Sequence, residues 1–429
     1  MNLTQLAGHA PSEDEAMKQG KVFEIPKALV WQSYQQVRKN KGAAGCDGQT
    51  LKEFEQNRDR NLYKIWNRLS SGSYFPPPVL EKKIPKGDGR ERLLGIPTVA
   101  DRIAQGAVKI HLERILEPEF DEDSYGYRPN KSAHDALEAC KRRCWKHSWV
   151  LELDIQAFFD CVRHDLILKA LTHHQVPRWV ILYCQRWLEA PSVESREQSV
   201  PKKRTLGTPQ GGVISPLLAN LFLHYAFDQW MRRNHPEVPF ERYADDAVCH
   251  CNTMREATRL KRDLEKRLTE VGLTLHPQKT QVVYVDTFER RNVKKSFTFL
   301  GYDFQRRTVK NTRTGKLFRV CMPGASKKAM KEITKTIRSW RIHRGTSENA
   351  QQLAQRYNAT VRGWITYYGK HWYRNFSYRL WTVLQSRLIK WVEAKYRLSV
   401  RAATRRLKLM KKENPRLFAH WDLLRASNT

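Results

Sequence analysis

Helical and strand-like spacings of apolar residues alternate along the first 150 positions. The helices that this pattern predicts cover residues 26–41, a stretch ending near Gly72, residues 98–117 and residues 134–145. Between them, two apolar-flanked segments enclose a loop rich in Gly and Asp over residues 79–97, which predicts a hairpin with a basic tip. Residues 1–24 are polar and weakly patterned, so we expect an extension or a frayed helix there.

Two predicted strand segments in the middle of the chain carry acidic side chains. Residues 149–160 alternate, with leucines on one face and Asp154 on the other, which predicts a half-buried strand. Residues 240–251 predict two short strands joined by a tight turn at 244–246. An amphipathic helix that Gly272 stops comes next. Further strand-like segments lie at residues 281–285, 297–304 and 317–321.

The period of the apolar residues changes after Gly324. From there on they recur only at helical spacing and outline three helices, around residues 333–340, 353–364 and 380–391. Strands mixed with helices up to about residue 320, and helices alone beyond it, predict an α+β body followed by an all-helical module.

The charge balance indicates a polyanionic partner. The 429-residue chain has 77 Lys and Arg against 44 Asp and Glu, a formal net charge of +33, so its surface carries a broad positive field. Residues 321–429 alone hold 24 cationic and 5 acidic residues, interleaved with Trp and Tyr. Aromatic rings beside cations suit nucleic-acid backbones and unstacked bases. Charge alone leaves open whether the partner is DNA or RNA, and whether the protein is an enzyme or a binder.

Other sequence features narrow the class of protein. Hydrophobic residues make up 40% of the chain, enough for a folded core. No apolar run approaches the roughly 18 residues of a membrane span, and the N-terminus has no features of an export signal. The close pairs Cys140/Cys144 and Cys249/Cys251 lack a second pair at zinc-finger spacing. We therefore expect reduced thiols in a cytoplasmic protein, nucleoid-associated in a bacterium, without a membrane partner.

Three aspartates are candidates for a divalent-metal site. Magnesium prefers hard oxygen ligands, so phosphoryl transfer by two metal ions needs at least two carboxylates at one point. Asp245 and Asp246 stand side by side in the predicted turn, where both side chains can face one site, and Asp154 on a separate strand supplies a third carboxylate. Two aspartates in a turn are also common as solvated turn residues. The aromatic residues that neighbour both segments favour the metal site.

The segments around these aspartates resemble those of reverse transcriptases. YADD at 243–246 is similar to their YxDD box, and DIQAFFD at 154–160 to their other catalytic strand. GTPQGGVISPLLANLFLH at 207–224 resembles the block between the two, and IPKGDGRERLLGIP at 84–97 resembles the fingers hairpin over the incoming nucleotide. Four further segments resemble one subgroup, the group II intron-encoded reverse transcriptases or maturases: YGYRPNKSAHDAL (125–137), FTFLGYDF (297–304), GWITYY (363–368) and PRLFAHW (415–421). The motifs follow the order of that family.

The resemblance implies a right-hand polymerase fold. Fingers and a palm with an antiparallel sheet would be followed by an all-helical, basic thumb and C-terminal region. The expected regions are an N-terminal extension (1–25), fingers with an RNA-binding extension (26–148), palm (149–322), thumb (323–392) and a basic region that binds DNA or RNA (393–429).

The resemblance also implies the catalytic centre. Asp154, Asp245 and Asp246, with the backbone carbonyl of Ile155, would hold two Mg²⁺ ions, which Mn²⁺ can replace. Asp154 and Asp245 would be the principal ligands. The three aspartates are therefore the expected catalytic residues.

Six further residues would contact the nucleotide. Phe159, preceded by Phe158, is the expected steric gate, because a bulky ring under the sugar leaves no room for a 2′-hydroxyl. Lys86 and Arg92 would grip the triphosphate, whereas Arg90 is interpreted as an ordinary surface cation. Gln210 would contact the nucleotide where the following glycines allow close approach. Lys279 either protonates the leaving pyrophosphate or is a solvated loop lysine.

The partners implied by the resemblance are nucleic acids. They comprise structured intron RNA, whose splicing the protein would assist, an RNA template with a DNA primer, deoxynucleotides and target DNA. Many relatives end in a metal-binding endonuclease module with Cys and His pairs. The sequence ends soon after residue 421 without such a cluster, so we expect no DNA-cutting activity of its own.

Two other functions remain open from the sequence. One is a splicing-only RNA-binding cofactor whose polymerase site is a relic, against which the intact set of acidic and nucleotide-contacting residues argues. The other is a domesticated relative that serves DNA repair or phage defence, which a gene without a surrounding intron would indicate. An RNA-copying RNA polymerase is disfavoured, because Phe159 would exclude ribonucleotides.

Overall fold

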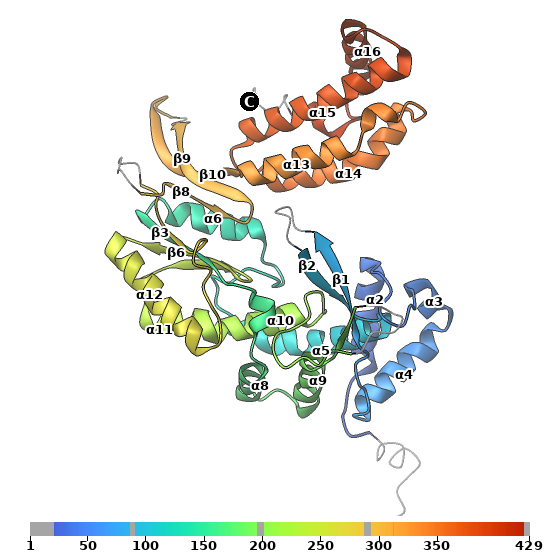
Figure 1. Ribbon diagram of the computed structural model, residues 1–429, viewed down its shortest axis with the longest axis vertical. Coiled ribbons are helices and arrows are strands. Elements are labelled where there is room, and N and C mark those ends of the chain that lie inside the picture. Colours follow the sequence, from blue (N-terminus) through green and yellow to red (C-terminus); the bar gives the residue numbers. More distant parts are fainter. Residues whose placement is uncertain (1–20, 86–90, 195–200, 287–292, 312, 424–429) are drawn as a thin grey trace, which may run out of the picture.

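A four-stranded antiparallel sheet lies at the centre of the chain (Figure 1). The computed structural model describes residues 21–85, 91–194, 201–286, 293–311 and 313–423. The sheet has the order β5-β6-β3-β7. Its strands are β3 (Trp149–Asp154), β5 (Phe240–Tyr243), β6 (Asp246–Cys251) and β7 (Gln281–Tyr284).

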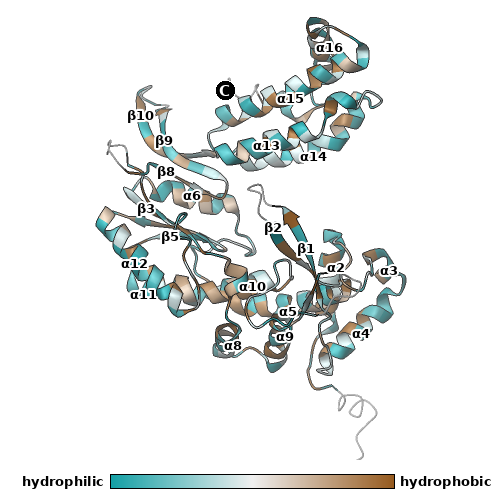
Figure 2. Cartoon of the chain, viewed as in Figure 1, coloured by the Kyte–Doolittle hydropathy of each residue, from teal (hydrophilic) through white to brown (hydrophobic). Residues whose placement is uncertain are grey.

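Helices cover this sheet and form the palm with it. Helix α12 (Met254–Glu270) begins with a capping box at Thr253 and buries Leu260, Leu264 and Leu268 against the sheet. Its remaining positions are largely polar, so the helix is striped in hydropathy (Figure 2). Further helices in this part of the chain are α6 (Ala133–Arg143), α7 (Phe158–Cys161), α8 (His164–His173), α9 (Arg178–Leu188), α10 (Ser215–Leu223), the π-helix η2 (His224–Asp228) and α11 (Gln229–Asn234).

Two strand predictions need correction. The strand predicted over residues 149–160 ends at Asp154, because Ala157 adopts a left-handed conformation (φ 46°) and starts the short helix α7. The strand predicted over residues 297–304 is a hairpin of β8 (Ser296–Phe299) and β9 (Tyr302–Lys310). Leu300 and Gly301 both have positive φ (50° and 77°) and make its tight turn, which leucine at the first turn position concealed in the sequence.

The fingers contain the predicted hairpin and the predicted helices. Strands β1 (Val79–Pro85) and β2 (Glu91–Ile96) pair from Leu80 opposite Ile96 to Pro85 opposite Glu91. Helices α2 and α5 pack so closely that a Cβ on Gly106 would lie 2.1 Å from the Ser33 hydroxyl. The helices of this region are α2 (Lys27–Asn40), α3 (Leu51–Gln56), α4 (Arg58–Ser70), α5 (Val99–Leu116) and the 3₁₀ turn η1 (Glu117–Glu119). A short strand, β4 (Ser192–Val193), pairs parallel to β1.

A second antiparallel sheet, β10-β9-β8, connects the palm to the thumb. Strand β9 (Tyr302–Lys310) pairs along its whole length with β10 (Leu317–Ala325). On thumb helix α14, the Tyr367 hydroxyl donates to the Leu300 carbonyl (2.8 Å). The Tyr367 carbonyl accepts from the Tyr302 hydroxyl and from Nε2 of His134 (2.9 Å). The thumb is therefore hydrogen-bonded to the palm beside the β8–β9 turn.

Helices alone make up the described chain beyond β10, as predicted. The thumb and the C-terminal region comprise α13 (Lys327–Ser339), η3 (Ile342–Arg344), α14 (Ala350–Tyr368), α15 (Tyr373–Tyr396), α16 (Val400–Glu413) and η4 (Ala419–Asp422). Helix α16 is additional to the three helices that the pattern outlined. Helix α15 runs through position 392, where we expected the thumb to end, so both regions share this helix.

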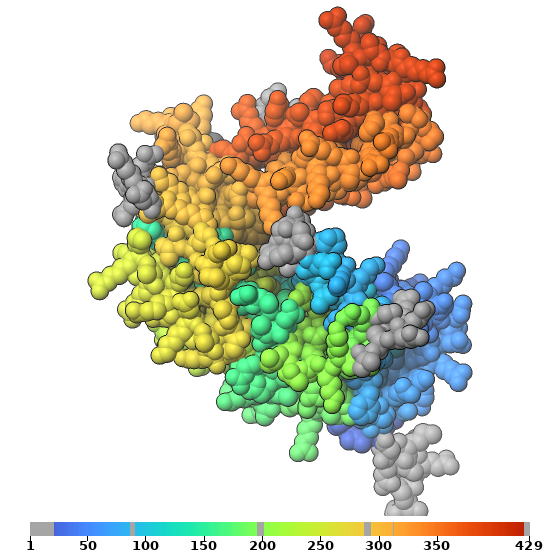
Figure 3. Space-filling view, in the orientation of Figure 1, coloured from blue at the N-terminus to red at the C-terminus, as the bar shows by residue number. Residues whose placement is uncertain are grey.

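The thumb helices arch over the rest of the molecule. In the space-filling view they are separated from the fingers by a deep open cleft (Figure 3). Among the residues that the structure describes, no helix is both long and apolar enough to cross a bilayer.

Buried histidines predict an acid-sensitive fold. Burial lowers the pKa of His224 to about 4 and that of His420 to about 3. Because an unfolded histidine titrates near 6.5, the unfolded chain binds more protons below that pH, and stability should fall as the pH drops from about 6.5 toward 4. Each histidine should cost about 2 kcal/mol between pH 6.5 and 5. Urea unfolding across this range should show a shallower pH slope for His420→Gln, and an unchanged slope would contradict the prediction.

Candidate active site

Three aspartates from two separate segments meet at one end of the palm sheet. Asp154 is the last residue of β3, and the strand register places it directly opposite Asp246, the first residue of β6. Asp245 lies in the two-residue turn between β5 and β6, beside the pair formed by Tyr243 and Asp246. The sheet thus brings together the three carboxylates that the sequence predicted as one site.

The surroundings of the carboxylates disfavour their negative charges. Burial raises the pKa of Asp245, and the charge of Asp154 adds to the rise. Asp246 keeps exposed surface, but the protein around it displaces much of its hydration. This desolvation, with repulsion from Asp245 and Asp154, raises its pKa to about 7. A cation held among the three oxygens would relieve this repulsion, and carboxylate oxygens are the ligands that Mg²⁺ prefers.

Lys279 supplies a positive charge at the same point. Its Nζ lies 2.6 Å from Oδ2 of Asp154. The loop that carries it is fixed to the end of β3, because the backbone N–H of His276 donates to the Asp154 carbonyl (2.8 Å). Of the two interpretations of Lys279, the structure therefore favours a residue of the site over an isolated loop lysine.

Buried contacts define the aspartate turn. Ala244 adopts a left-handed conformation (φ 56°), and its carbonyl accepts from Nη1 of Arg242 (3.1 Å). The Arg242 guanidinium is 1% exposed and forms a bidentate ion pair with Asp228 at 2.7 and 2.5 Å. Behind the turn, a Cβ on Gly126 would lie 2.4 Å from the Ala244 nitrogen. Only glycine allows the 125–127 segment to pack this closely.

One cavity of about 540 Å³ gathers the predicted residues. Residues from the fingers, the palm sheet and the loops between them line it. They are Arg92, Tyr127, Asp154, Ile155, Gln156, Ala157, Phe158, Phe159, Asp160, Gln210, Tyr243, Ala244, Asp245, Asp246, His276, Lys279 and Leu300. Lys86 and Arg90 fall outside the described residues. Every other residue predicted for the catalytic centre and the nucleotide contacts lies on this cavity.

The fingers reach the cavity through Arg92 and Gln210. Nε of Arg92 donates to Oε1 of Gln210 at 2.5 Å. The loop that carries Gln210 is anchored to β2 next to this contact, because the backbone N–H of Gly95 donates to the Gln210 carbonyl (2.7 Å). Gly211 has φ 120°, and a Cβ there would lie 2.4 Å from the Gly95 carbonyl. Glycine at position 211 therefore permits close packing of this segment against β2, and the predicted close approach to a nucleotide stays a prediction.

Phe158 and Phe159 follow the catalytic strand on α7. Both rings are largely buried, at 2% and 9% exposure, and pack edge to face with centroids 5.3 Å apart. Backbone contacts fix the position of Phe159, because its carbonyl accepts from the Thr208 N–H (2.8 Å). A Cβ on Gly207 would meet that carbonyl at 2.7 Å. The Phe159 ring thus lines the cavity on a rigid backbone.

Tyr127 and His276 line the cavity although the sequence did not single them out. The Tyr127 ring lies 6.4 Å from that of Tyr243, and burial, followed by the charge of Asp245, raises the Tyr127 pKa. Tyr127 belongs to the YGYRPN segment, which was recognised only as a motif. Its distance of more than 100 positions from Asp245 and Asp246 hid its place in the site.

A different acidic cluster lies behind the sheet. Within the described part of the chain, Cys140, Glu241 and His250 are the group whose ligand atoms all lie within 4.8 Å of one another. Here Glu241 already accepts from Nη1 of Arg143 (2.6 Å) and from Nε2 of His250 (2.7 Å). These contacts satisfy its charge without a metal ion.

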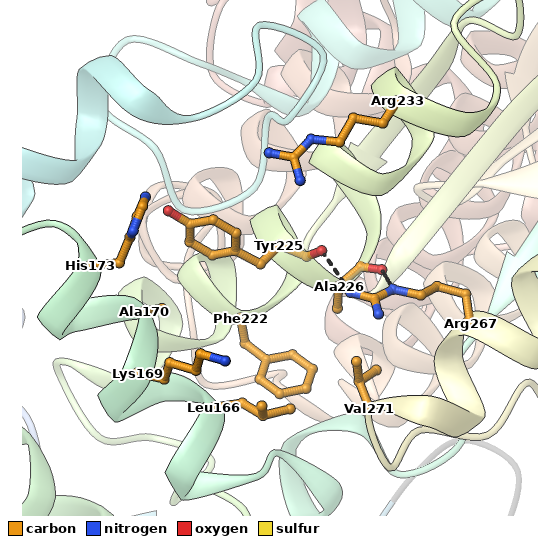
Figure 4. A pocket seen from close by; sticks show the side chains of 10 residues that line it. All are labelled: Leu166, Lys169, Ala170, His173, Phe222, Tyr225, Ala226, Arg233, Arg267 and Val271. Carbon is orange, nitrogen blue, oxygen red and sulfur yellow. Dashed lines mark hydrogen bonds between the residues drawn. The ribbon is translucent and has the colours of Figure 1, made fainter.

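A second cavity, of about 330 Å³, is enclosed by α8, η2 and α12 (Figure 4). Its floor is apolar, with Phe222 and Val271. At one side the Arg267 guanidinium donates to the carbonyls of Tyr225 (3.1 Å) and Ala226 (3.2 Å). Arg267 thereby satisfies carbonyls at the π-helix. None of the predicted site residues lines this cavity.

Comparison with protein families identifies two matching regions. The family described as "Reverse transcriptase (RNA-dependent DNA polymerase)" matches residues 84–304. The family described as "Group II intron, maturase-specific domain" matches residues 330–409. The first region contains the acidic cavity, and the second begins in α13.

Three individual proteins are also similar to this chain, each over a different share of its length. "Group II intron-encoded protein LtrA" of Lactococcus lactis is 36% identical over 199 residues, 46% of this chain and 32% of that protein. "Protein YkfC" of Escherichia coli is 29% identical over 65% of this chain and 80% of its own length. "Putative COX1/OXI3 intron 1 protein" of Saccharomyces cerevisiae is 24% identical over 88% and 53%, respectively. The match to LtrA thus spans about a third of that protein.

Gly126 offers a test of the packing behind the aspartate turn. Gly126→Ala should lower the free energy of unfolding by about 1–3 kcal/mol, because the new methyl group overlaps the backbone of the turn. Gly363→Ala is the matched control, since a Cβ there meets nothing within 4 Å on an exposed face of α14. The control should be neutral or stabilising by up to about 1 kcal/mol. Equal melting temperatures for the two variants would contradict the packing argument.

Proposed function

This chain belongs to the reverse transcriptase family and carries a group II intron maturase-specific domain behind its polymerase domain, and from this premise we propose that it copies RNA into DNA. Its primer would be DNA, its template RNA and its substrates deoxynucleoside triphosphates. The observation that carries the proposal is the acidic cavity, in which Asp154 faces Asp246 across two strands and Asp245 lies in the adjoining turn.

We infer that the three aspartates hold two Mg²⁺ ions, with Mn²⁺ as a substitute and the Ile155 carbonyl as a further ligand. The donor set fits, since it consists of carboxylate oxygens on an accessible cavity, and the pKa values of Asp245 and Asp246 are raised. Bound ions of this kind activate the attacking 3′ oxygen and neutralise charge on the triphosphate. Asp154 must exchange its contact with Lys279 for such an ion.

The other residues of the cavity bind and orient the nucleotide in this proposal. Arg92 and Lys86 would hold the triphosphate, and Gln210, which accepts from Arg92, would position both the arginine and the nucleotide. Lys279 is within reach of the reacting centre and would give a proton to the leaving pyrophosphate. Phe159 would close the space below the sugar.

The nucleic acid would occupy the cleft between thumb and fingers (Figure 3). The chain carries a formal net charge of +33, which favours a backbone of phosphates. We further propose that the protein binds a structured intron RNA, assists its splicing and copies it at a target DNA. The maturase-specific match over residues 330–409 supports this part of the proposal.

Replacing one aspartate should abolish DNA synthesis and leave RNA binding nearly unchanged. Asp245→Asn should reduce primer extension on an RNA template by at least about a thousandfold, because it removes a metal ligand from the reacting centre. RNA affinity should stay within about twofold, since little of the positive surface changes. Asp59→Asn, on exposed α4, is the control and should extend primers normally. Substantial extension by the Asp245 variant would overturn the metal assignment.

Phe159 tests the choice of sugar. Phe159→Ala should admit ribonucleotides, because it removes the ring that would collide with a 2′-hydroxyl. The ratio of incorporation rates for deoxy- and ribonucleotides should fall by at least about tenfold, as expected for the loss of a steric clash. Tyr63→Ala removes an exposed ring of α4, outside the cavity, and should leave the ratio nearly unchanged. If both variants kept the wild-type ratio, the gate would lie elsewhere.

A further inference from the structure

The β9–β10 ribbon projects from the palm (Figure 1). Leu300 lines that cavity, and β9 starts two residues later and continues for nine residues. At about 3.3 Å per residue, the far end of β9 lies roughly 30 Å from its start. The distal end therefore cannot contact a nucleotide in the cavity.

The distal half of the ribbon is cationic. The sequence contains no Asp or Glu between Asp303 and Glu332. Lys310, Arg313 and Lys316 lie at the tip and are exposed. Asp303, at the base of β9, is the acidic residue of the ribbon, and none follows it along the ribbon to neutralise the three cations.

Hydrogen bonds join the described residues of the tip. The Asn311 side chain accepts from the backbone N–H groups of Arg313 (2.9 Å) and Thr314 (3.1 Å). Gly315 adopts φ 70°, and its N–H donates to the Asn311 carbonyl (2.9 Å). The three cations are thus presented from a fixed backbone, which lowers the entropy lost when a partner binds.

Apolar side chains are exposed directly beside these cations. Leu317 is 70% and Phe318 is 47% exposed. Phe318 pairs with Val309 across the ribbon, so both lie on the same face. A two-stranded ribbon with exposed apolar residues is poorly stable in water by itself, and such a surface commonly marks an interaction site.

We propose that the distal β9–β10 ribbon is a docking element for structured RNA outside the polymerase cleft. Lys310, Arg313 and Lys316 contact phosphates on one helix, and the Phe318 ring stacks on an unpaired base next to that helix. Fully paired DNA fits less well, because its bases are stacked and offer no face to the ring. This inference rests on the proposed function in that it takes RNA to be the macromolecule bound.

The charge contribution can be measured with a defined RNA. The probe is a labelled RNA hairpin with an internal loop, and the variant is Lys310→Gln/Arg313→Gln/Lys316→Gln. Its affinity should fall at least about tenfold, and its log–log salt slope should decrease by about 3, for three duplex phosphates at about 0.9 each. The control Arg255→Gln/Arg259→Gln/Arg262→Gln removes the same charge from the outer face of α12 and should bind nearly as the wild type does.

The stacking contribution needs a second variant and a second RNA. Phe318→Ala should weaken binding of the looped hairpin by about tenfold, but not that of a fully paired RNA hairpin of equal length. Phe75→Ala, which alters an exposed ring of the fingers, should change neither. Wild-type affinity of both ribbon variants for the looped hairpin would overturn the proposal, as would a larger loss for duplex DNA.

Primer extension separates this inference from the proposed function. On a short primed RNA template that does not reach the ribbon, both ribbon variants should extend at the wild-type rate, which also shows that they are folded. A wild-type protein that binds the looped hairpin through the ribbon but extends no primer would refute the polymerase proposal alone. Normal extension with ribbon-independent RNA binding would refute the docking element alone.

Discussion

The site depends on holding like charges together against their repulsion. Asp154 and Asp246 face each other because they are register partners at the end of two hydrogen-bonded strands, so separating them would break the ladder of the sheet. Desolvation and mutual repulsion raise the pKa of Asp246 to about 7. The fold compensates in two ways. Lys279 pairs with Asp154, and the buried pair of Arg242 and Asp228 fixes the turn that carries Asp245.

A buried charge network joins this site to the loop that follows α5. Arg143 donates to Asp123 (2.8 Å) and to Glu241 (2.6 Å), while Arg232 pairs with both Asp121 and Asp123. Glu241 also accepts from His250, whose pKa rises to about 10 through the neighbouring Glu241 charge despite burial. Removing one member would leave an uncompensated charge in the interior, so the network resists rearrangement of the strands beside the aspartate turn.

Patterns among residues close together in the sequence predicted much of the fold and of the candidate site. The β1–β2 hairpin, the Ala244–Asp245 turn and the apolar stripe of α12 are set by residues close together in the sequence, and the family resemblance added which acidic residues converge. What escaped prediction depends on contacts between distant segments. Gly126 is buried against Ala244, and Arg242 reaches Asp228, for reasons that no local pattern contains. The pattern of residues 297–304 predicts one strand where the structure has a hairpin, because no neighbouring residue indicates that Leu300 adopts a positive φ.

The hydrogen bonds of Tyr367 couple the position of the thumb to the acidic cavity. Because its hydroxyl holds the carbonyl of Leu300, and Leu300 is part of the wall of the acidic cavity, the thumb cannot swing outward as a free lever. An outward movement of the thumb must either break the hydrogen bond between Tyr367 and Leu300 or displace Leu300 in the cavity wall. The position of the thumb and the shape of the acidic cavity are therefore coupled through Tyr367.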